Sequence, residues 1–413
     1  MTSLSRARPG ERDLIRSLFA QTRRSAVRPP GRRVPSTTRI CRAGGTAITT
    51  IAHTQPARLT VGVDTHKEVH VACAKDQLGR RLATTLVATT TAGYAELLGW
   101  ADALGQVEAF GIEGTGCYGA ELARFLRGHG QRVVEVNRPD RAARRRHGKS
   151  DPVDAEAAAR AVQAGEATGL PKAGDGVVEM LRVLRVARQT AVRARTQTIN
   201  ALKALVVTAP DSLRQQLRDL PTRQLVATAA AFQPDTPATP TMATMVALGA
   251  LARRYQVLDG EITMLSKQLH RLVRLAAPAL LAVFGVGPET ASALLVAAGD
   301  NPQRLHSDAA FAALCGASPV EVSSGKTVRH RLNRGGDRQA NNALWRIVLV
   351  RLRAGHPPTV AYLTRRLAQG KSKREAIRCL IGGVSGCGPF RAGSCSRYVS
   401  GGRPRCLATR WPV

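Results

Sequence analysis

The stretch "ARLTVGVDTHKEVHVACAKDQLGRRLATTLVAT" (residues 57–89) decides the fold. It holds two runs rich in apolar and β-branched residues, around 59–65 and 68–75, then a turn at "DQLGR" and a third run near 82–88. Short runs of this kind, separated by turn residues, are typical of β-strands. The stretch therefore predicts a strand, hairpin and strand at the start of a sheet.

Helical and strand patterns alternate in the residues that follow. The pattern predicts helices over 91–104 and 117–130, strands over 107–113 and 132–137, and a further helix that begins near Asp151. Alternation of strands and helices favours an α/β architecture. The sequence thus predicts an α/β domain with a mixed sheet over residues 58–165.

Two long amphipathic helices are predicted over residues 176–275, separated by a loop at 233–241. The first has apolar residues at spacings of three and four, with the arginines at 182, 185, 188, 193 and 195 mostly off that stripe. The stripe of the first helix contains Met180, Leu184, Ala187, Ala191, Ala194, Leu202 and Leu205, and that of the second contains Leu258, Ile262, Leu265, Leu269 and Leu272. Such a pair predicts an antiparallel hairpin or coiled coil, which could also form a dimer contact.

A mainly helical unit is predicted over residues 276–382. Its Gly285 and Gly287 lie between two helical runs and resemble a helix-hairpin-helix turn that can hold a phosphate, although a plain tight turn between core helices fits equally well. Residues 1–57 and 383–413 are rich in Arg, Pro, Gly and Ser without a regular period, so both ends are predicted to be disordered extensions.

The charge of the chain indicates a polyanionic partner. The 413 residues carry a formal net charge of +32, of which +18 lies between the two end segments, and 44% of the residues are hydrophobic. A folded protein this basic is typical of nucleic-acid binding. No apolar run is long enough to span a membrane, the N-terminus lacks the apolar core of a secretory signal, and the eight cysteines form no CxxC pair. We therefore expect a cytoplasmic, nucleoid-associated protein without a membrane partner.

Four acidic residues are candidates for one catalytic site. Asp64 and Glu113 end two predicted strands, at the edge where open α/β sheets bind ligands. Asp151 and Asp154 lie three positions apart at the start of a predicted helix, roughly 5–6 Å apart on one face. Taken singly, each acid is more simply read as a turn former or a helix cap. Together, on three adjoining elements of a basic domain, they favour convergence on one point.

Converging carboxylates predict a metal site. They repel one another unless a cation neutralises them, and oxygen ligands select Mg²⁺, which often acts as a pair of ions in displacement at phosphorus. The two helical acids lie in the segment "RPDRAARRRHGKSDPVDAEAAAR" (residues 138–160), whose part before Asp151 is strongly basic. We expect its Arg141, Arg144, Arg145, Arg146 and Lys149 to hold the nucleic-acid backbone against that site.

These segments resemble a known family. "VGVDTHKEVHVACA", "GIEGTGCYGAELARFL" and "NRPDRAARRRHGKSDPVDAEAAARA" are similar to the DEDD motifs of insertion-sequence 110 family transposases, relatives of the Piv DNA invertases. The likeness continues through "VFGVGPETASALLVAAGD" and "FAALCGASPVEVSSGKTVRHRLNRGGDRQANNALWRIVLVRL". It covers residues 59–380.

The resemblance implies a fold and an activity. The fold would be a RuvC-like domain of RNase H type, a coiled-coil region and a C-terminal transposase domain. The activity would be DNA strand cleavage and exchange guided by a bridge RNA, carried out by a dimer or tetramer on double-stranded DNA. Asp64, Glu113, Asp151 and Asp154 would bind the metal ions.

The nucleophile implied by the resemblance is a serine in "PVEVSSGK". Ser323 and Ser324 both fit, and the spacing after Pro319 favours Ser323. The surrounding loop carries Lys326, Arg329, Arg331 and Arg334, which we expect to contact backbone phosphate. Two alternatives stay open at this point: a RuvC-like endonuclease that uses activated water, and an inactive nucleic-acid-binding remnant of a transposase.

Overall fold

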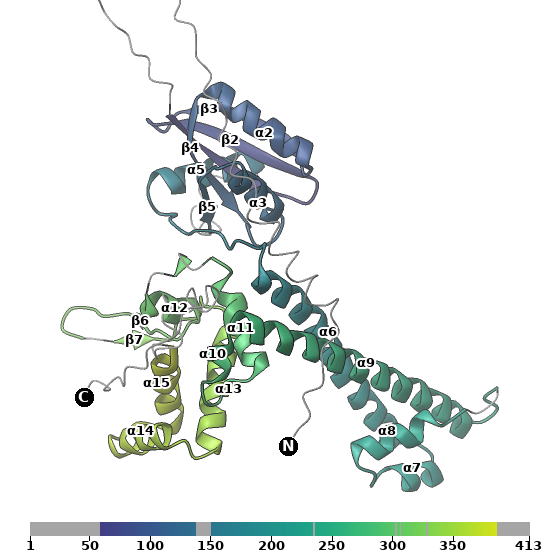
Figure 1. The fold of residues 1–413 in the computed structure, drawn as a ribbon. Coiled ribbons are helices and arrows are strands. Elements are labelled where there is room, and N and C mark those ends of the chain that lie inside the picture. Colours follow the sequence, from purple (N-terminus) through teal and green to yellow (C-terminus); the bar gives the residue numbers. More distant parts are fainter. Residues whose placement is uncertain are drawn as a thin grey trace, which may run out of the picture. The chain divides into compact units, whose positions relative to one another are not determined.

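The computed structural model describes residues 58–137, 150–233, 236–301, 304–305, 307–327 and 329–385. The first part of the chain forms one five-stranded sheet with the order β3-β2-β1-β4-β5 (Figure 1). Its strands are β1 (Arg58–Thr65), β2 (Val69–Asp76), β3 (Arg81–Ala88), β4 (Gln106–Glu113) and β5 (Val133–Val136). The pairs β1–β2 and β2–β3 are antiparallel, whereas β1–β4 and β4–β5 are parallel. The predicted mixed α/β fold is confirmed, and it is consistent with an RNase H-like domain.

The alternation of side chains along β1 decides which face each helix covers. Leu59, Val61 and Val63 are fully buried in a core with residues of α2 (Thr91–Leu104) and α3 (Ala120–Gly128). Successive residues of a strand point to opposite faces of the sheet. Thr60, Gly62 and Asp64 therefore lie on the other face, which α5 (Asp151–Gln163) covers.

Glycines in the strands let α5 approach the sheet closely. A Cβ atom at Gly62 would lie 2.0 Å from the carbonyl oxygen of Ala155 and 2.3 Å from the nitrogen of Ala159. A Cβ atom at Gly111 on β4 would lie 2.6 Å from the side chain of Val162. Only glycine fits at Gly62, where two backbones are this close, so this position allows the middle of α5 to lie directly on β1.

Two long helices follow, α6 (Val177–Thr208) and α9 (Pro240–Ala276), and they pack side by side (Figure 1). At one end of the pair, α7 (Asp211–Leu217) and α8 (Thr222–Ala230) complete a core around Leu202 and Leu248. The two helices predicted from the apolar stripes are thus present, with the short helices α7 and α8 in the connection between them.

The predicted apolar stripe of α6 is wrong at Met180 and Ala187, whereas Leu184 packs against the core and Ala191 is buried. Met180 is 51% exposed and Ala187 is exposed, whereas Val178, Leu181 and Arg185 are buried. Arg185 can be buried because its guanidinium donates hydrogen bonds to Ser292 Oγ at 2.7 Å and to the Glu289 carbonyl oxygen at 2.9 Å. The buried face is therefore set by residues that lie about a hundred positions later in the chain.

The remaining helices form a further core with the adjoining ends of α6 and α9. It includes Leu181 of α6, Val273 of α9 and Leu344 of α13, all of them almost fully buried. The elements are α10 (Pro278–Leu281), α11 (Pro288–Ala298), α12 (Asp308–Leu314), β6 (Val320–Glu321), β7 (His330–Arg331), α13 (Arg338–Arg353), α14 (Pro357–Ala368) and α15 (Lys373–Ser385). The predicted mainly helical character of this region is confirmed.

The helices of the described ranges differ from membrane spans. None of the helices found there is both long and apolar enough to cross a bilayer.

Candidate active site

Two of the four predicted acids are brought together by the register of parallel strands. Val63 of β1 pairs with Ile112 of β4, so the next residues, Asp64 and Glu113, lie at neighbouring strand ends. Both fall on the face that α5 covers, because Val63 and Ile112 point into the opposite core. Asp64 is 8% exposed and Glu113 is 9% exposed. The sheet therefore holds two carboxylates side by side at the carboxyl ends of β1 and β4.

The other two acids come from the N-terminal turn of α5. Ala155 and Ala159 of this helix lie against Gly62, and Asp151 and Asp154 precede them toward the end of β1 that carries Asp64. Asp154 is buried, whereas half of the Asp151 side chain is exposed. The helix thus places one enclosed and one solvent-facing carboxylate at the end of β1.

His66 joins two of these acids, and sequence reasoning missed it. Its Nε2 lies 3.2 Å from Asp64 Oδ2 and 3.4 Å from Asp151 Oδ2. One ligand atom from each of Asp64, His66 and Asp151 lies within 4.8 Å of the others. The available signal was the spacing in "VDTHK", because a residue two positions after Asp64 tends to return to the same side of an extended chain.

A second histidine accepts a hydrogen bond from the backbone of His66. The His66 amide donates a hydrogen bond to His70 Nδ1 at 3.3 Å, and His70 is fully buried and stacked on Tyr94. Burial lowers the pKa of His70 to about 4, and His66 acts in the same direction. His70 is therefore neutral at physiological pH and can accept this hydrogen bond.

The pKa of Asp64 is raised by its surroundings. Burial raises its pKa, and the charges of Asp154 and Asp151 raise it further, while His66 opposes them. Carboxylates that repel one another in a partly buried place are stabilised by a cation. The donor set of carboxylate oxygens with one imidazole nitrogen fits a divalent metal ion, and Asp64, Asp151 and His66 lie close enough together to share one.

The candidate nucleophiles lie in the hairpin formed by β6 and β7. Ser323 and Ser324 are both exposed. Ser323 Oγ accepts a hydrogen bond from the Arg329 amide at 3.3 Å, whereas Ser324 closes a tight turn with Thr327 through its backbone. Gly325 in that turn has a φ of +56°, which suits glycine. The two hydroxyls are thus presented on an exposed turn whose backbone is fixed.

The predicted nucleic-acid-binding residues fall into two groups. Arg141, Arg144, Arg145, Arg146 and Lys149 lie outside the described residues. Lys326, Arg329, Arg331 and Arg334 are exposed on or beside the hairpin, and the structure shows no ion pair for them within the described ranges. The second group is therefore free to contact an anion.

Comparison with known protein families identifies two regions of the chain. Residues 61–209 match the family model of the DEDD transposase of IS110, described as a transposase. Residues 277–364 match the family described as transposase IS116/IS110/IS902. Together the two matches cover more than half of the chain, including the four acids and both serines. No curated protein matches the chain.

Proposed function

Because the chain belongs to the IS110 family of transposases, we propose that it cleaves and rejoins DNA strands with four acidic residues and a serine nucleophile. The observation that supports this most directly is the grouping of Asp64, His66 and Asp151 at the end of β1, beside Asp154 and Glu113. Transposase families act on DNA, and the net charge of +32 suits that substrate.

The acids are proposed to hold divalent cations. Asp64, Glu113, Asp151 and Asp154 would be the ligands, and the ions are proposed to be Mg²⁺, two in number. When bound, such ions neutralise charge that develops on phosphate oxygens. The half-exposed Asp151 gives solvent access to the site, while the buried Asp64 and Asp154 fix its inner wall. His66 would help to orient Asp64 and Asp151, because its Nε2 lies 3.2 Å from one carboxylate and 3.4 Å from the other.

A serine is proposed to attack the DNA backbone. Oγ of Ser323 or Ser324 would form a bond to phosphorus while one phosphorus–oxygen bond of the strand breaks, and the serine proton would pass to the leaving oxygen. One ester replaces another, so the strand can be rejoined without ATP. Lys326, Arg329, Arg331 and Arg334 would hold neighbouring phosphates, because their side chains are exposed on the same segment.

Guidance and assembly are further parts of the proposal. The resemblance to the family supports a bridge RNA that pairs with donor and target DNA, and a dimer or tetramer of the chain on double-stranded DNA. The basic residues before α5, at 141, 144, 145, 146 and 149, would contact the backbone next to the acids. Target choice would then depend on RNA pairing rather than on side chains that read bases.

The test is a covalent-adduct assay. Purified protein is mixed with Mg²⁺, labelled duplex DNA that carries the sequences flanking the gene, and RNA transcribed from the same flank. We expect a protein–DNA adduct that survives denaturing electrophoresis. Asp154→Asn should lower adduct formation at least about a hundredfold, since it removes a charge that would hold the ions. Ser323→Ala and Ser324→Ala, tested singly, should identify the nucleophile by complete loss in one of them.

Ser318→Ala is the matched control, because Ser318 precedes the hairpin and should leave the adduct unchanged. An adduct in the Ser323→Ala/Ser324→Ala double variant would show that the nucleophile is assigned wrongly. Cleaved DNA without any adduct in the wild type would show a hydrolase that uses water. DNA binding without cleavage in every condition would show a transposase remnant.

A further inference from the structure

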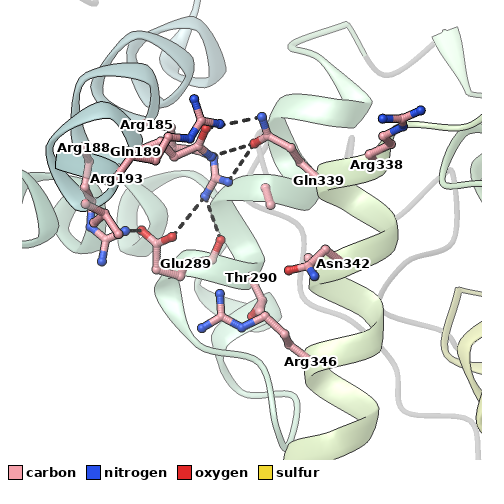
Figure 2. A pocket seen from close by; sticks show the side chains of 13 residues that line it. Arg185, Arg188, Gln189, Arg193, Glu289, Thr290, Arg338, Gln339, Asn342 and Arg346 are labelled. Atoms are coloured by element: carbon pink, nitrogen blue, oxygen red, sulfur yellow. Dashed lines mark hydrogen bonds and ion pairs between the residues drawn. The ribbon is translucent and has the colours of Figure 1, made fainter. Parts of the chain in front are cut away.

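A basic cavity lies between α6, α11 and α13, within the helical part of the molecule. Its volume is about 340 Å³. The charged side chains that line it are Arg185, Arg188, Arg193, Arg338, Arg346 and one acid, Glu289 (Figure 2). Because α6, α11 and α13 share one hydrophobic core, these side chains are held on a common frame.

The acid in this cavity is already engaged. Glu289 pairs with Arg188 at 2.9 Å and with Arg185 at 3.5 Å. Arg185 also donates hydrogen bonds to Ser292 Oγ and, at 3.1 Å, to Gln339 Oε1. Figure 2 draws its contacts with Glu289 and Gln339 as dashed lines. These contacts use the only carboxylate among the lining residues, and they leave the cavity with a surplus of positive charge.

Three arginines supply that surplus. Arg193, Arg338 and Arg346 are exposed, and within the part of the chain that the structure describes they form no ion pair. Asp337, which precedes Arg338, caps α13 by accepting hydrogen bonds from the amides of Gln339 and Ala340. Several cations without a partner acid around one hollow favour a bound anion.

A second cavity, of about 450 Å³, shares Arg338 and Asn342 with the first. It adds Trp345, Arg334 and Arg378. Arg338, Asn342, Trp345 and Arg346 fall at helical spacings of four, three and one, so they lie along one side of α13. Trp345 is 41% exposed and lines the second cavity. We call this side, with its two adjoining cavities, the α13 face.

We propose that the α13 face binds a single DNA strand, with backbone phosphates at Arg338 and Arg346 and one unpaired base stacked on Trp345. Grooves that bind single strands combine cations that follow the backbone with an aromatic ring that stacks a base. A base inside a duplex already stacks on its neighbours, so an indole on this face can gain that contact only from an unpaired base. The choice of DNA rests on the proposed function.

The α13 face would hold a strand close in the chain to the proposed serine nucleophiles. Cleavage would leave a strand end that must stay bound until it is rejoined. The serine hairpin is followed in the chain by Arg334, which lines the second cavity. The amide of Asn342 in both cavities can bond to a phosphate or a base edge.

The test compares two charge-matched double variants of the full chain. Arg338→Gln/Arg346→Gln removes two cations from the α13 face. Arg254→Gln/Arg271→Gln removes two exposed arginines of α9 that line neither cavity. Binding of a labelled oligothymidine is followed by fluorescence anisotropy from about 50 to 300 mM salt, where each lost phosphate contact lowers the slope of log affinity against log salt by about 0.7. We expect a fall of about 1.4 for the first variant and a much smaller fall for the second.

The aromatic contact is tested separately. Trp345→Ala should weaken oligothymidine binding about tenfold without changing the salt slope, and Trp345→Phe should retain most of the affinity. All of these binding measurements are made without divalent metal, where no strand is cut, so a failure of the proposed chemistry would not affect the result.

Four outcomes would overturn the proposal. They are no oligothymidine binding by the wild type, equal falls in both double variants, an equal effect of Trp345→Ala on duplex DNA, and a larger effect of the α13 variants on oligouridine RNA than on oligothymidine. The last outcome would assign the face to RNA.

Discussion

Like charges gather in two regions of this molecule. One is the set of acids at the ends of β1 and β4 and the start of α5, which we call the acidic edge (Asp64, Glu113, Asp151 and Asp154), and the other is the α13 face. The repulsion between like charges differs in strength between the two. At the acidic edge, the Asp64 side chain is only 12% exposed and other carboxylates lie near it. On the α13 face, Arg193, Arg338 and Arg346 are exposed to solvent. Water screens the repulsion among the arginines, whereas burial strengthens the repulsion among the acids.

The difference shows which functional residues lower the stability of the fold: the buried acids do, and the exposed arginines do not. The acids are held together by a close contact of α5 with the sheet, so the rest of the fold must oppose their repulsion. The arginines are placed by a core beneath them and repel one another weakly. Changes at the acidic edge should therefore alter folding as well as activity, and changes on the α13 face should alter binding alone.

The largest loss of stability is expected for a substitution at Gly62, where α5 contacts β1. Gly62→Ala places a Cβ atom 2.0 Å from the Ala155 carbonyl oxygen, and backbone cannot yield as a side chain tip can. We expect a loss of about 3 kcal/mol in the free energy of unfolding, measured by urea denaturation, and loss of DNA cleavage as α5 shifts away from Asp64.

Gly99→Ala is the matched control for that change. Gly99 lies within α2, and a Cβ atom there meets nothing within 4 Å. Replacing a helical glycine should raise the free energy of unfolding by up to about 1 kcal/mol. Similar losses in the two variants would show that the Gly62 contact does not control the position of α5.

The next test uses Glu156, a carboxylate of α5 that forms an ion pair with a buried lysine. Glu156, two residues after Asp154, accepts a hydrogen bond from Lys75 Nζ at 2.8 Å, and the Lys75 side chain is 4% exposed. Glu156→Gln leaves that buried ammonium without its charge partner. We expect a loss of about 2 kcal/mol in the free energy of unfolding, because Glu156 is partly exposed and the full effect of a buried pair is larger.

The same pair predicts a dependence on pH. The hydrogen bond from Lys75 holds the pKa of Glu156 below its usual range. A carboxyl whose pKa is lowered by folding stabilises the fold above its unfolded pKa of about 4.3 and loses that contribution as the pH falls through the folded value. Urea titrations below about pH 4 should show this loss in the wild type and not in Glu156→Gln. Parallel pH profiles would contradict the assignment.

The sequence predicted the positions of the acids on their strands and helix better than it predicted contacts between distant segments. The positions of Asp64 and Asp154 followed from local signals, a strand end and a helix start, which depend on neighbouring residues. The burial of Arg185 could not be predicted, because it depends on Ser292 and Gln339 at distant positions. His66 was missed for the same reason, since its contact with Asp151 exists only after α5 docks on the sheet.

A smaller change in stability, of opposite sign, is expected at Asp64. Asp64→Asn removes one of the repelling carboxylates from the acidic edge, and without divalent metal we expect the free energy of unfolding to rise by about 1 kcal/mol. Added Mg²⁺ should then stabilise the wild type more than the variant, since the ions would bind the folded acids. Arg338→Gln/Arg346→Gln, by contrast, should change unfolding by less than about 0.5 kcal/mol.

Calorimetry with and without Mg²⁺ separates these cases. A wild type and an Asp64→Asn variant that melt alike in both conditions would mean that the carboxylates do not strain the fold and do not share a metal. A clear destabilisation by Asp64→Asn would mean that its contact with His66 at 3.2 Å holds the structure together. A gain without metal that disappears when Mg²⁺ is added would mean that the acidic edge is stabilised by the ion it is proposed to bind, whereas the α13 face needs no ligand to stay folded.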